Sequence, residues 1–238
     1  MAERRVGGLS WPVGSFLGRL PEHDRQVLLC SGGMREYDPG ACLVLQGQPG
    51  IDVIALLSGC AKVVGVTADG DETIVDIRTT GDLVGEMANM DGGVRSSTVV
   101  AVRRVLGVVI AGQRFQELLG RHPAVAAALS ATMAKKLRTA TRLHVDLLHG
   151  PVIARLARLL IHLAELHGLP GDGGRLIDVP LSQRDLASLV GTTEPSVYRA
   201  LTELRRRGAV STRRRFVCVR DPGSLALAAA ITDGRARG

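Results

Sequence analysis

The sequence predicts an α+β protein with three parts: a β-rich N-terminal domain at residues 16–121, a long helix at residues 122–149 and a mixed C-terminal domain at residues 150–222. Three observations predict this class. Short apolar runs recur about every ten residues in the first part, the second part contains no Gly, and two short helical patterns followed by a hairpin pattern lie in the third. Both flanking parts are long enough to bury a core of their own.

The N-terminal domain is predicted to be a β-sandwich or β-barrel. Its six strand candidates lie between Tyr37 and Ile110 and are CLVL, VIALL, AKVVGV, TIVDI, STVVAV and VLGVVI. Turn signals separate them, at Asp38–Gly40, Gln48–Gly50, Ser58–Gly59 and Ala68–Asp71. The Asp-Gly dipeptide in the last of these predicts a tight hairpin between the third and fourth strands.

The loop before the fifth strand, GEMANMDGGVRSSTVV, is rich in small and flexible residues. Gly85, Gly92 and Gly93 allow the chain to turn tightly and leave backbone N–H groups unobstructed. A loop of this kind suits the binding of an anion, because backbone N–H groups can then donate to it.

Charged and hydroxyl side chains in the same loop suit a phosphate ligand. Arg95 offers a cation, and Ser96 and Ser97 offer hydroxyl donors. Glu86 would repel a phosphate, but its carboxylate could accept a hydrogen bond from a ligand hydroxyl, such as that of ribose. The alternative is a solvated loop in which Glu86 and Arg95 bind nothing.

The long helix is predicted to begin at His122–Pro123, because Pro is favoured in a first helical turn. Its apolar residues form a narrow stripe with spacings of three and four, and the flanking positions are polar. This heptad-like pattern favours a two-chain coiled coil over packing on the N-terminal domain alone. The stripe consists of Leu129, Met133, Leu137, Ala140, His144 and Leu147.

The C-terminal domain opens with the amphipathic segment PVIARLARLLIHLAELHG, and the polar loop LPGDGGRLIDV leads from it into a strand. Ser182 and Asp185 form a capping pair for the next helix. Gly191 makes the turn, Thr193 caps a second helix, and Arg207–Gly208 ends it. This spacing indicates a helix-turn-helix, and VSTRRRFVCVRD predicts a hairpin after it.

Positive charge is concentrated in the C-terminal third. Residues 1–149 carry 16 Lys and Arg against 15 Asp and Glu, whereas residues 150–238 carry 14 against 8, so +6 of the net charge of +7 lies there. Arg213–Arg215 lie at the hairpin tip, and Arg205–Arg207 end the second helix. This charge favours a polyanionic partner over a merely solvated face. An aromatic content of 3% argues against base stacking on single strands.

Four segments, YDPGACLVLQG, LLSGCAKVV, TADGDETIVDIRTTGDLVGEM and RSSTVVA, resemble the cyclic-nucleotide-binding β-roll of the Crp/Fnr (cyclic-AMP receptor protein/fumarate–nitrate regulator) family of bacterial transcription factors. The resemblance runs roughly from Phe16 to Asp221 and implies a dimerisation helix after the roll and a C-terminal winged helix-turn-helix. It implies a homodimer that binds double-stranded promoter DNA under the control of a small-molecule effector, cAMP or cGMP. RNA polymerase is a further partner that it implies. The alternative is a Crp/Fnr-type regulator with a different effector or with none.

The resemblance also implies ligand contacts. Glu86 would bind the ribose 2′-hydroxyl, and Arg95 with Ser96 would bind the cyclic phosphate. In cyclic-AMP-binding members a Thr-Ser pair on the long helix contacts the adenine; it falls on Ala140 and Thr141 here, so one polar contact is missing. The full set expected at the ligand comprises Gly85, Glu86, Met87, Arg95, Ser96, Lys136 and Thr141.

By the same resemblance, the second helix of the helix-turn-helix would read DNA. Cyclic-AMP-responsive members begin this helix with Arg-Glu, carry another Arg one turn later and read TGTGA half-sites. The matching residues here are Glu194, Pro195 and Arg199. We therefore expect half-sites that differ from TGTGA but keep a guanine that Arg199 contacts. The residues expected at the DNA are Thr193, Glu194, Ser196, Arg199, Arg213, Arg214 and Arg215.

Other classes of function have little support in the sequence. No G-x-S-x-G, P-loop or H-E-x-x-H pattern is present and the four Cys show no CxxC spacing, so we expect no catalysis, no cofactor and no metal site. The basic helix-turn-helix argues against a nucleotide-binding module that only regulates another protein. The apolar runs are too short to span a membrane and no signal peptide is evident, so we expect a cytoplasmic protein with no membrane partner.

Overall fold

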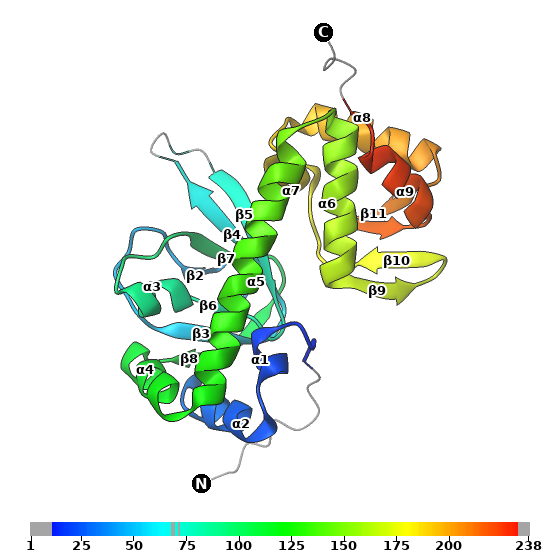
Figure 1. Ribbon diagram of the computed structural model, residues 1–238. Coiled ribbons are helices and arrows are strands. Elements are labelled where there is room, and N and C mark those ends of the chain that lie inside the picture. The colour runs from blue at the N-terminus through cyan, green and yellow to red at the C-terminus, as the bar shows by residue number, and fades with distance from the viewer. Residues whose placement is uncertain (1–10, 68–69, 71, 233–238) are drawn as a thin grey trace. The chain divides into compact units, whose positions relative to one another are not determined.

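The computed structural model describes residues 11–67, 70 and 72–232. The chain folds into two compact units, Met1–Lys136 and Leu137–Gly238, and the long helix α5 (Pro123–Leu148) begins in the first and ends in the second (Figure 1). The α+β class is confirmed. Because the division falls inside α5, the three-part division of the chain stays a prediction.

Two four-stranded antiparallel sheets form the β-rich part of the first unit, with the orders β1-β8-β3-β6 and β2-β7-β4-β5. Ile54 and Leu56 from one sheet and Val63 and Val99 from the other share a buried cluster, so the two sheets form a sandwich. The strands are β1 (Gly33–Tyr37), β2 (Cys42–Val44), β3 (Val53–Ser58), β4 (Cys60–Val66), β5 (Glu72–Thr79), β6 (Leu83–Val84), β7 (Thr98–Ala101) and β8 (Val105–Ile110).

All six predicted strands are present. The hairpin predicted at Ala68–Asp71 joins β4 to β5, which pair antiparallel, although residues 68, 69 and 71 themselves lie outside the described residues. Strands β1 and β6 are missing from the prediction for physical reasons. The sequence of β1, GMREY, is short and mostly exposed, and β6 has only two residues, so neither shows a hydrophobic alternation.

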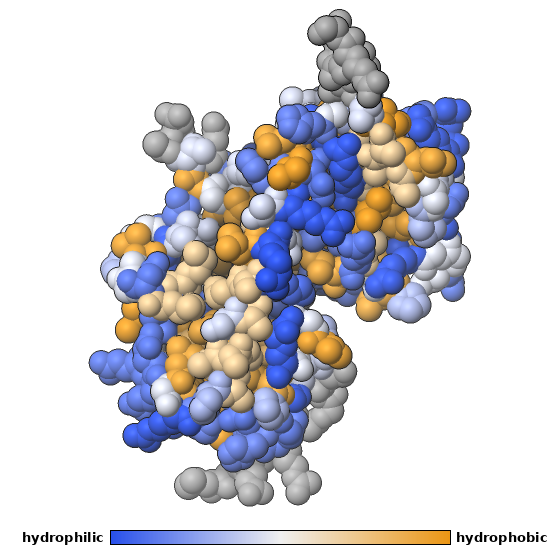
Figure 2. All heavy atoms as spheres, viewed as in Figure 1, coloured by the Kyte–Doolittle hydropathy of each residue, from blue (hydrophilic) through white to orange (hydrophobic). Residues whose placement is uncertain are grey.

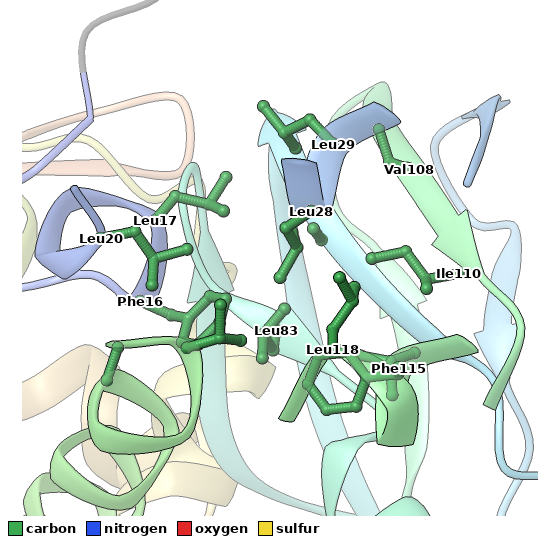
Figure 3. Packing of buried hydrophobic residues seen from close by; sticks show 14 of the residues in the cluster. Phe16, Leu17, Leu20, Leu28, Leu29, Leu83, Val108, Ile110, Phe115 and Leu118 are labelled. Atoms are coloured by element: carbon green, nitrogen blue, oxygen red, sulfur yellow. The ribbon is translucent and has the colours of Figure 1, made fainter. Parts of the chain in front are cut away.

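Helices cover the other face of the sheet that contains β3 and β8. They are α1 (Phe16–Arg19), α2 (Glu22–Cys30), α4 (Gly112–Arg121) and the N-terminal part of α5. Figure 3 shows side chains from these helices, among them Leu28, Phe115 and Leu118, gathered around Leu83 of β6. Each large apolar side chain buried in this way contributes about 1.5–3 kcal/mol, so this core fixes the strands that flank the candidate ligand site.

The apolar stripe predicted along α5 divides into two parts. Leu129 is buried, and Met133, which is partly buried, packs against the core of the first unit. They pack on the N-terminal domain, which is the alternative that the pattern left open. The exposed part of the stripe begins at Leu137, which is 70% exposed, and includes Ala140 and His144. Figure 2 shows strongly hydrophilic side chains along part of α5.

The second unit contains α6 (Val152–His167), α7 (Gln183–Val190), α8 (Glu194–Arg206), α9 (Pro222–Ala229) and an antiparallel sheet of order β11-β12-β10-β9. The sheet consists of β9 (Gly168–Gly171), β10 (Gly174–Ile177), β11 (Val210–Arg213) and β12 (Phe216–Val219). Helix α6 packs against the other three helices. In the part of the chain that is described, no helix combines the length and the apolar character that crossing a bilayer requires.

Two elements of the second unit differ from the prediction. The segment LPGDGGRLIDV is mostly the hairpin β9–β10 rather than a polar loop, because Asp172-Gly173 forms a two-residue turn with Gly173 at φ 72°. Helix α9 was not predicted, because its sequence PGSLALAA is almost uniformly small and apolar and shows no amphipathic period.

The predicted helix caps are largely present. Ser182 and Asp185 form a reciprocal capping box at the start of α7, and Gly191 ends α7 with φ 66°. Thr193 occupies the N-cap position of α8, but its hydroxyl donates to Ser196 Oγ at 3.1 Å instead of accepting from the helix backbone. The predicted cap position is therefore confirmed, although the Thr193 hydroxyl bonds to a second hydroxyl one turn away instead of to the backbone.

One side chain ties the corner between α5 and α6. Arg158 of α6 donates from Nη1 to the backbone oxygens of Asp146 and His149, at 2.6 and 2.7 Å. Its Nε donates to the backbone oxygen of Ala229, the last residue of α9, at 2.9 Å. The last carbonyls of a helix have no partner within the helix, so Arg158 satisfies groups that the ends of α5 and α9 leave open.

Candidate functional site

The predicted ligand loop, here called the cassette (Gly85–Ser97), lies between β6 and β7. It is not only a tight turn, because it contains the short helix α3 (Glu86–Asp91). Gly85 and Gly92 flank that helix with φ of 84° and 70°, as expected for glycines that turn the chain. Gly93 has no positive φ, and its N–H donates to Asp91 Oδ1 at 2.9 Å in a local turn.

The guanidinium of Arg95 lies against the backbone, and the residue is only 8% exposed. Nη1 donates to Gly85 O at 2.8 Å and Nη2 donates to Asp52 O at 2.7 Å. Burial lowers the pKa of Arg95 from its usual value, and the carboxylates of Asp52 and Glu86 act in the opposite direction. The group stays cationic at neutral pH because a guanidinium starts from so high a pKa. Two of its five N–H groups are used here, which leaves three for a ligand.

Gly85 is required where it stands. A Cβ at this position would clash with Arg95 Nη1 and would lie 2.7 Å from Asp52 O. The positive φ of Gly85 is also one that residues with a side chain rarely adopt. Gly85 therefore lets the guanidinium approach the backbone and sets the direction in which α3 leaves the sheet.

Glu86 is the second buried charge of the cassette, with its side chain 5% exposed. Its Oε1 accepts from Nζ of Lys136, on α5, at 2.5 Å, and the charge of Arg78 on β5 also acts on it. Burying a carboxylate without a partner would be costly, so Lys136 explains how Glu86 is tolerated. Its other oxygen, Oε2, makes no hydrogen bond to any described residue and can accept one from a ligand.

The cassette is braced by a residue that the sequence analysis did not single out. Asn89 of α3 is 5% exposed, and its Nδ2 donates to Ile51 O at 2.8 Å and to Gly112 O at 3.1 Å. Gln116 of α4 donates to Asn89 Oδ1 at 2.8 Å. These bonds join α3 to the loop before β3 and to α4. The partners are 38 and 23 residues away along the chain, so no local pattern could have revealed them.

The remaining residues of the predicted ligand set differ in position. Met87 is 51% exposed, and the hydroxyl of Ser96, also exposed, lies 3.9 Å from Met87 Sδ. The structure therefore brings Gly85, Glu86, Met87, Arg95, Ser96 and Lys136 together within the first unit. Thr141 belongs to the second unit, where its hydroxyl donates to Leu137 O within α5 at 2.9 Å.

A chain of hydrogen bonds restrains Arg199, the residue of α8 that is predicted to recognise a base. Thr193 donates to Ser196 Oγ, and Arg199 Nη2 donates to the same oxygen at 3.2 Å. Arg199 and Glu194 are both exposed, while Val197 on the inner side of α8 is buried. Arg199 is thus restrained on one side and free to donate from its other nitrogens.

The arginines at the end of α8 are not equivalent. Glu203 accepts two hydrogen bonds from Arg206 and one from Arg207, each at 2.8 Å, and these hydrogen bonds lower the pKa of Glu203 to about 2. Arg205 instead donates to Thr202 Oγ1 at 2.8 Å and to Thr212 Oγ1 of β11 at 3.3 Å. Glu203 therefore offsets the charge of two of the three arginines. The i,i+3 and i,i+4 spacing from Glu to Arg is a signal for this pairing that the sequence contains.

The tip of the hairpin β11–β12, here called the wing, has an unusual backbone. Arg213 pairs with Phe216, and the two residues between them, Arg214 and Arg215, have φ of 35° and 68°. Two-residue turns with positive φ at both positions normally contain Asn or Gly. Arg215 O accepts from Leu181 N at 2.8 Å, which ties the wing to the chain before α7. All three arginines are exposed.

A cavity of 360 Å³ opens between the wing, α8 and the start of α7. Its polar lining combines the hydroxyl of Ser182 and the amide of Gln183 with three guanidinium groups, and an anionic group would suit it. The polar residues are Ser182, Gln183, Arg205, Thr212, Arg214 and Arg215.

Comparison with known proteins identifies both parts of the chain. Residues 34–122 match the family model of the cyclic nucleotide-binding domain, and residues 154–228 match that of the Crp-like helix-turn-helix domain. The chain is 31% identical over 196 residues to the "Cyclic AMP receptor protein" of Thermus thermophilus, covering 82% of this chain and 87% of that protein.

A second relative is the "CRP-like cAMP-activated global transcriptional regulator" of Mycobacterium tuberculosis, which is 26% identical over 191 residues, or 80% of this chain and 85% of the relative. Among solved structures, the c-di-GMP responsive global regulator CLP of Xanthomonas campestris has the same fold, with a TM-score of 0.72 and 21% identity over 84% of this chain and 100% of that one. These domains and relatives are those of transcriptional regulators rather than enzymes. The chain therefore belongs to the Crp/Fnr family of DNA-binding transcription regulators, with a cyclic-nucleotide-binding domain and a Crp-like helix-turn-helix.

Proposed function

We propose that this regulator is a homodimer whose DNA binding is controlled by a cyclic mononucleotide, cAMP or cGMP, bound in the cassette. The observation that carries the proposal is the pair of buried charges, Glu86 and Arg95, held in one short segment beside Lys136. A folded chain gains little stability from buried charges, so a ligand that uses them is the better explanation of their presence.

The chemistry of the two charges matches two parts of the ligand. Arg95 has three N–H groups left for the cyclic phosphate, and the hydroxyl of Ser96 is exposed beside them. Oε2 of Glu86 would accept from the ribose 2′-hydroxyl while Oε1 remains with Lys136. Gly85 and Met87 would line the same site.

The base is the part of the ligand with the weakest recognition. Ala140 has no polar side chain, so Thr141 alone would supply a polar contact from α5. The two relatives with cyclic AMP in their names favour cAMP. The second candidate is a different effector, which the c-di-GMP responsive relative with the same fold illustrates.

Dimerisation would use the exposed part of the stripe on α5. Leu137 of the stripe is 70% exposed, and Val145 and Leu148, outside the stripe but on the same helix, are more than half exposed, which is unusual for large apolar residues on one helix of a monomer. A second copy of α5 would cover them as in a two-chain coiled coil.

Recognition of DNA would combine base reading by α8 with phosphate contacts from the wing. Arg199 would read a guanine, with Thr193 and Ser196 holding the guanidinium, and Glu194 would contact the DNA from the first turn of α8. The three wing arginines, Arg213 to Arg215, would contact phosphates and so position the protein.

Calorimetric titration of the full-length protein with cAMP, cGMP and c-di-GMP tests the proposal. We expect one of the cyclic mononucleotides to bind and the Arg95→Leu variant to bind it about 30-fold or more weakly, because a buried phosphate would lose its matched cation. The control is Arg104→Leu, since Arg104 is exposed and pairs only loosely with Asp38, at 3.5 Å. Binding of c-di-GMP alone, or unchanged affinity in Arg95→Leu, would contradict the proposal.

A further inference from the structure

Tyr198 of α8 is an exposed aromatic residue at the centre of the candidate DNA interface. Its side chain is 54% exposed, and within the described residues its hydroxyl makes no hydrogen bond. The chain contains only two Tyr, and aromatic residues make up 3% of it. An exposed ring next to Arg199 is therefore not one of many on an aromatic-rich surface.

The geometry of α8 places this ring on the reading face. Successive residues of an α-helix are rotated by about 100°, and the buried residues of α8 define its inner face. Pro195 and Thr202 lie near the middle of the opposite, outward face. Tyr198 and Arg199 flank that line on either side, so the two longest side chains of this part of the face point outward together.

Next to this line on the Tyr198 side the surface is apolar, although two exposed charged residues, Glu194 and Arg205, lie further round the helix on that side. Pro195 and Tyr198 are separated by one turn, both are exposed, and neither carries a charge. In the major groove of DNA, the 5-methyl group of thymine is the one apolar group that a base presents. An aromatic ring whose hydroxyl makes no hydrogen bond to any described residue is well suited to contact it.

We propose that Tyr198 is a second specificity-determining residue, whose ring packs against the 5-methyl group of a thymine close to the guanine read by Arg199. Consecutive Cα atoms are about 3.8 Å apart and base pairs rise about 3.4 Å, so the thymine lies within two base pairs of that guanine. The inference rests on the proposed role of α8 as the recognition helix.

The test uses full-length protein with its effector and a site selected from random duplexes. Each thymine of the site is replaced in turn by uracil, which removes only the methyl group, and binding is followed by fluorescence anisotropy. We expect one replacement to weaken wild-type binding about fourfold, the effect of one methyl group removed from contact. Tyr198→Phe should keep this sensitivity, because it keeps the ring, and Tyr198→Ala should lose it.

The controls separate this inference from the function on which it rests. Leu169→Ala removes another half-exposed apolar side chain of the same unit, on β9, and should retain the full sensitivity to uracil. Sensitivity that persists in Tyr198→Ala, or no sensitive thymine within two base pairs of the guanine, overturns the proposal. Loss of sensitivity in Tyr198→Phe also overturns it, because the hydroxyl would then be the active group. If no duplex is selected at all, the proposed DNA recognition fails instead.

Discussion

Replacing Arg214 with Gly should make the second unit more stable and its DNA binding weaker. Arg214 has φ 35° in the turn of the wing, and a left-handed backbone costs a residue with a side chain about 1–2 kcal/mol. Gly avoids this cost, but the greater conformational freedom of Gly in the unfolded chain lowers the free energy of unfolding by roughly 0.5–1 kcal/mol. The net gain is about 0.5–1 kcal/mol, which raises the Tm of a domain of this size by about 2–6 °C.

Two measurements on the full-length protein test this expectation. Calorimetry follows the unfolding transition of the second unit, and a salt titration follows the affinity for a DNA duplex. Each phosphate contact that is lost lowers the slope of log affinity against log salt by about 0.9. Arg214→Gly should therefore show a higher Tm together with a smaller slope.

Arg213→Gly is the matched control, because it removes the same charge one position earlier. Arg213 lies in strand β11 and has no positive φ, so Gly relieves no strain there and should lower the Tm through its poor fit in a strand. The slope should fall as it does in Arg214→Gly. If both variants lose stability alike, the strain argument is refuted, and if neither changes the slope, the wing does not contact phosphates.

Three further predictions concern other parts of the molecule. Leu137→Asp would place charges in the seam between two copies of α5 and should give monomers by light scattering, whereas a dimer of unchanged mass would disprove the seam. Glu86→Gln should weaken cyclic-nucleotide binding less than Arg95→Leu does in calorimetry, because an amide oxygen still accepts from a hydroxyl; an equal or larger loss would exclude that role. Glu203→Gln should release its two arginine partners and steepen the salt dependence of DNA binding by up to about 2 in slope, and an unchanged slope would show that those arginines lie away from the DNA.

The features that the sequence predicts best are those with a local physical signature. The six apolar strands, the capping box at Ser182 and the glycine turn at Gly191 each depend on a few neighbouring residues, and all are present. Helix α9 and strand β1 were not predicted, because the sequence of neither shows a hydrophobic period. The burial of Glu86 and Arg95 and the brace at Asn89 depend on partners far along the chain, so sequence reasoning could suggest the residue types but not their environment.

The three hydrogen bonds of Arg158 bear on how the chain can be divided. A fragment that began at residue 150 would lack Asp146 O and His149 O, and one that stopped at residue 222 would lack Ala229 O. Each such cut would leave the half-buried guanidinium of Arg158 without one or more of its hydrogen-bond acceptors. Limited proteolysis and gene fusion should therefore release a stable DNA-binding piece only when it keeps the last turns of α5 and all of α9. A DNA-binding segment that folds when it is joined to another protein must therefore extend beyond the helix-turn-helix and the wing at both ends.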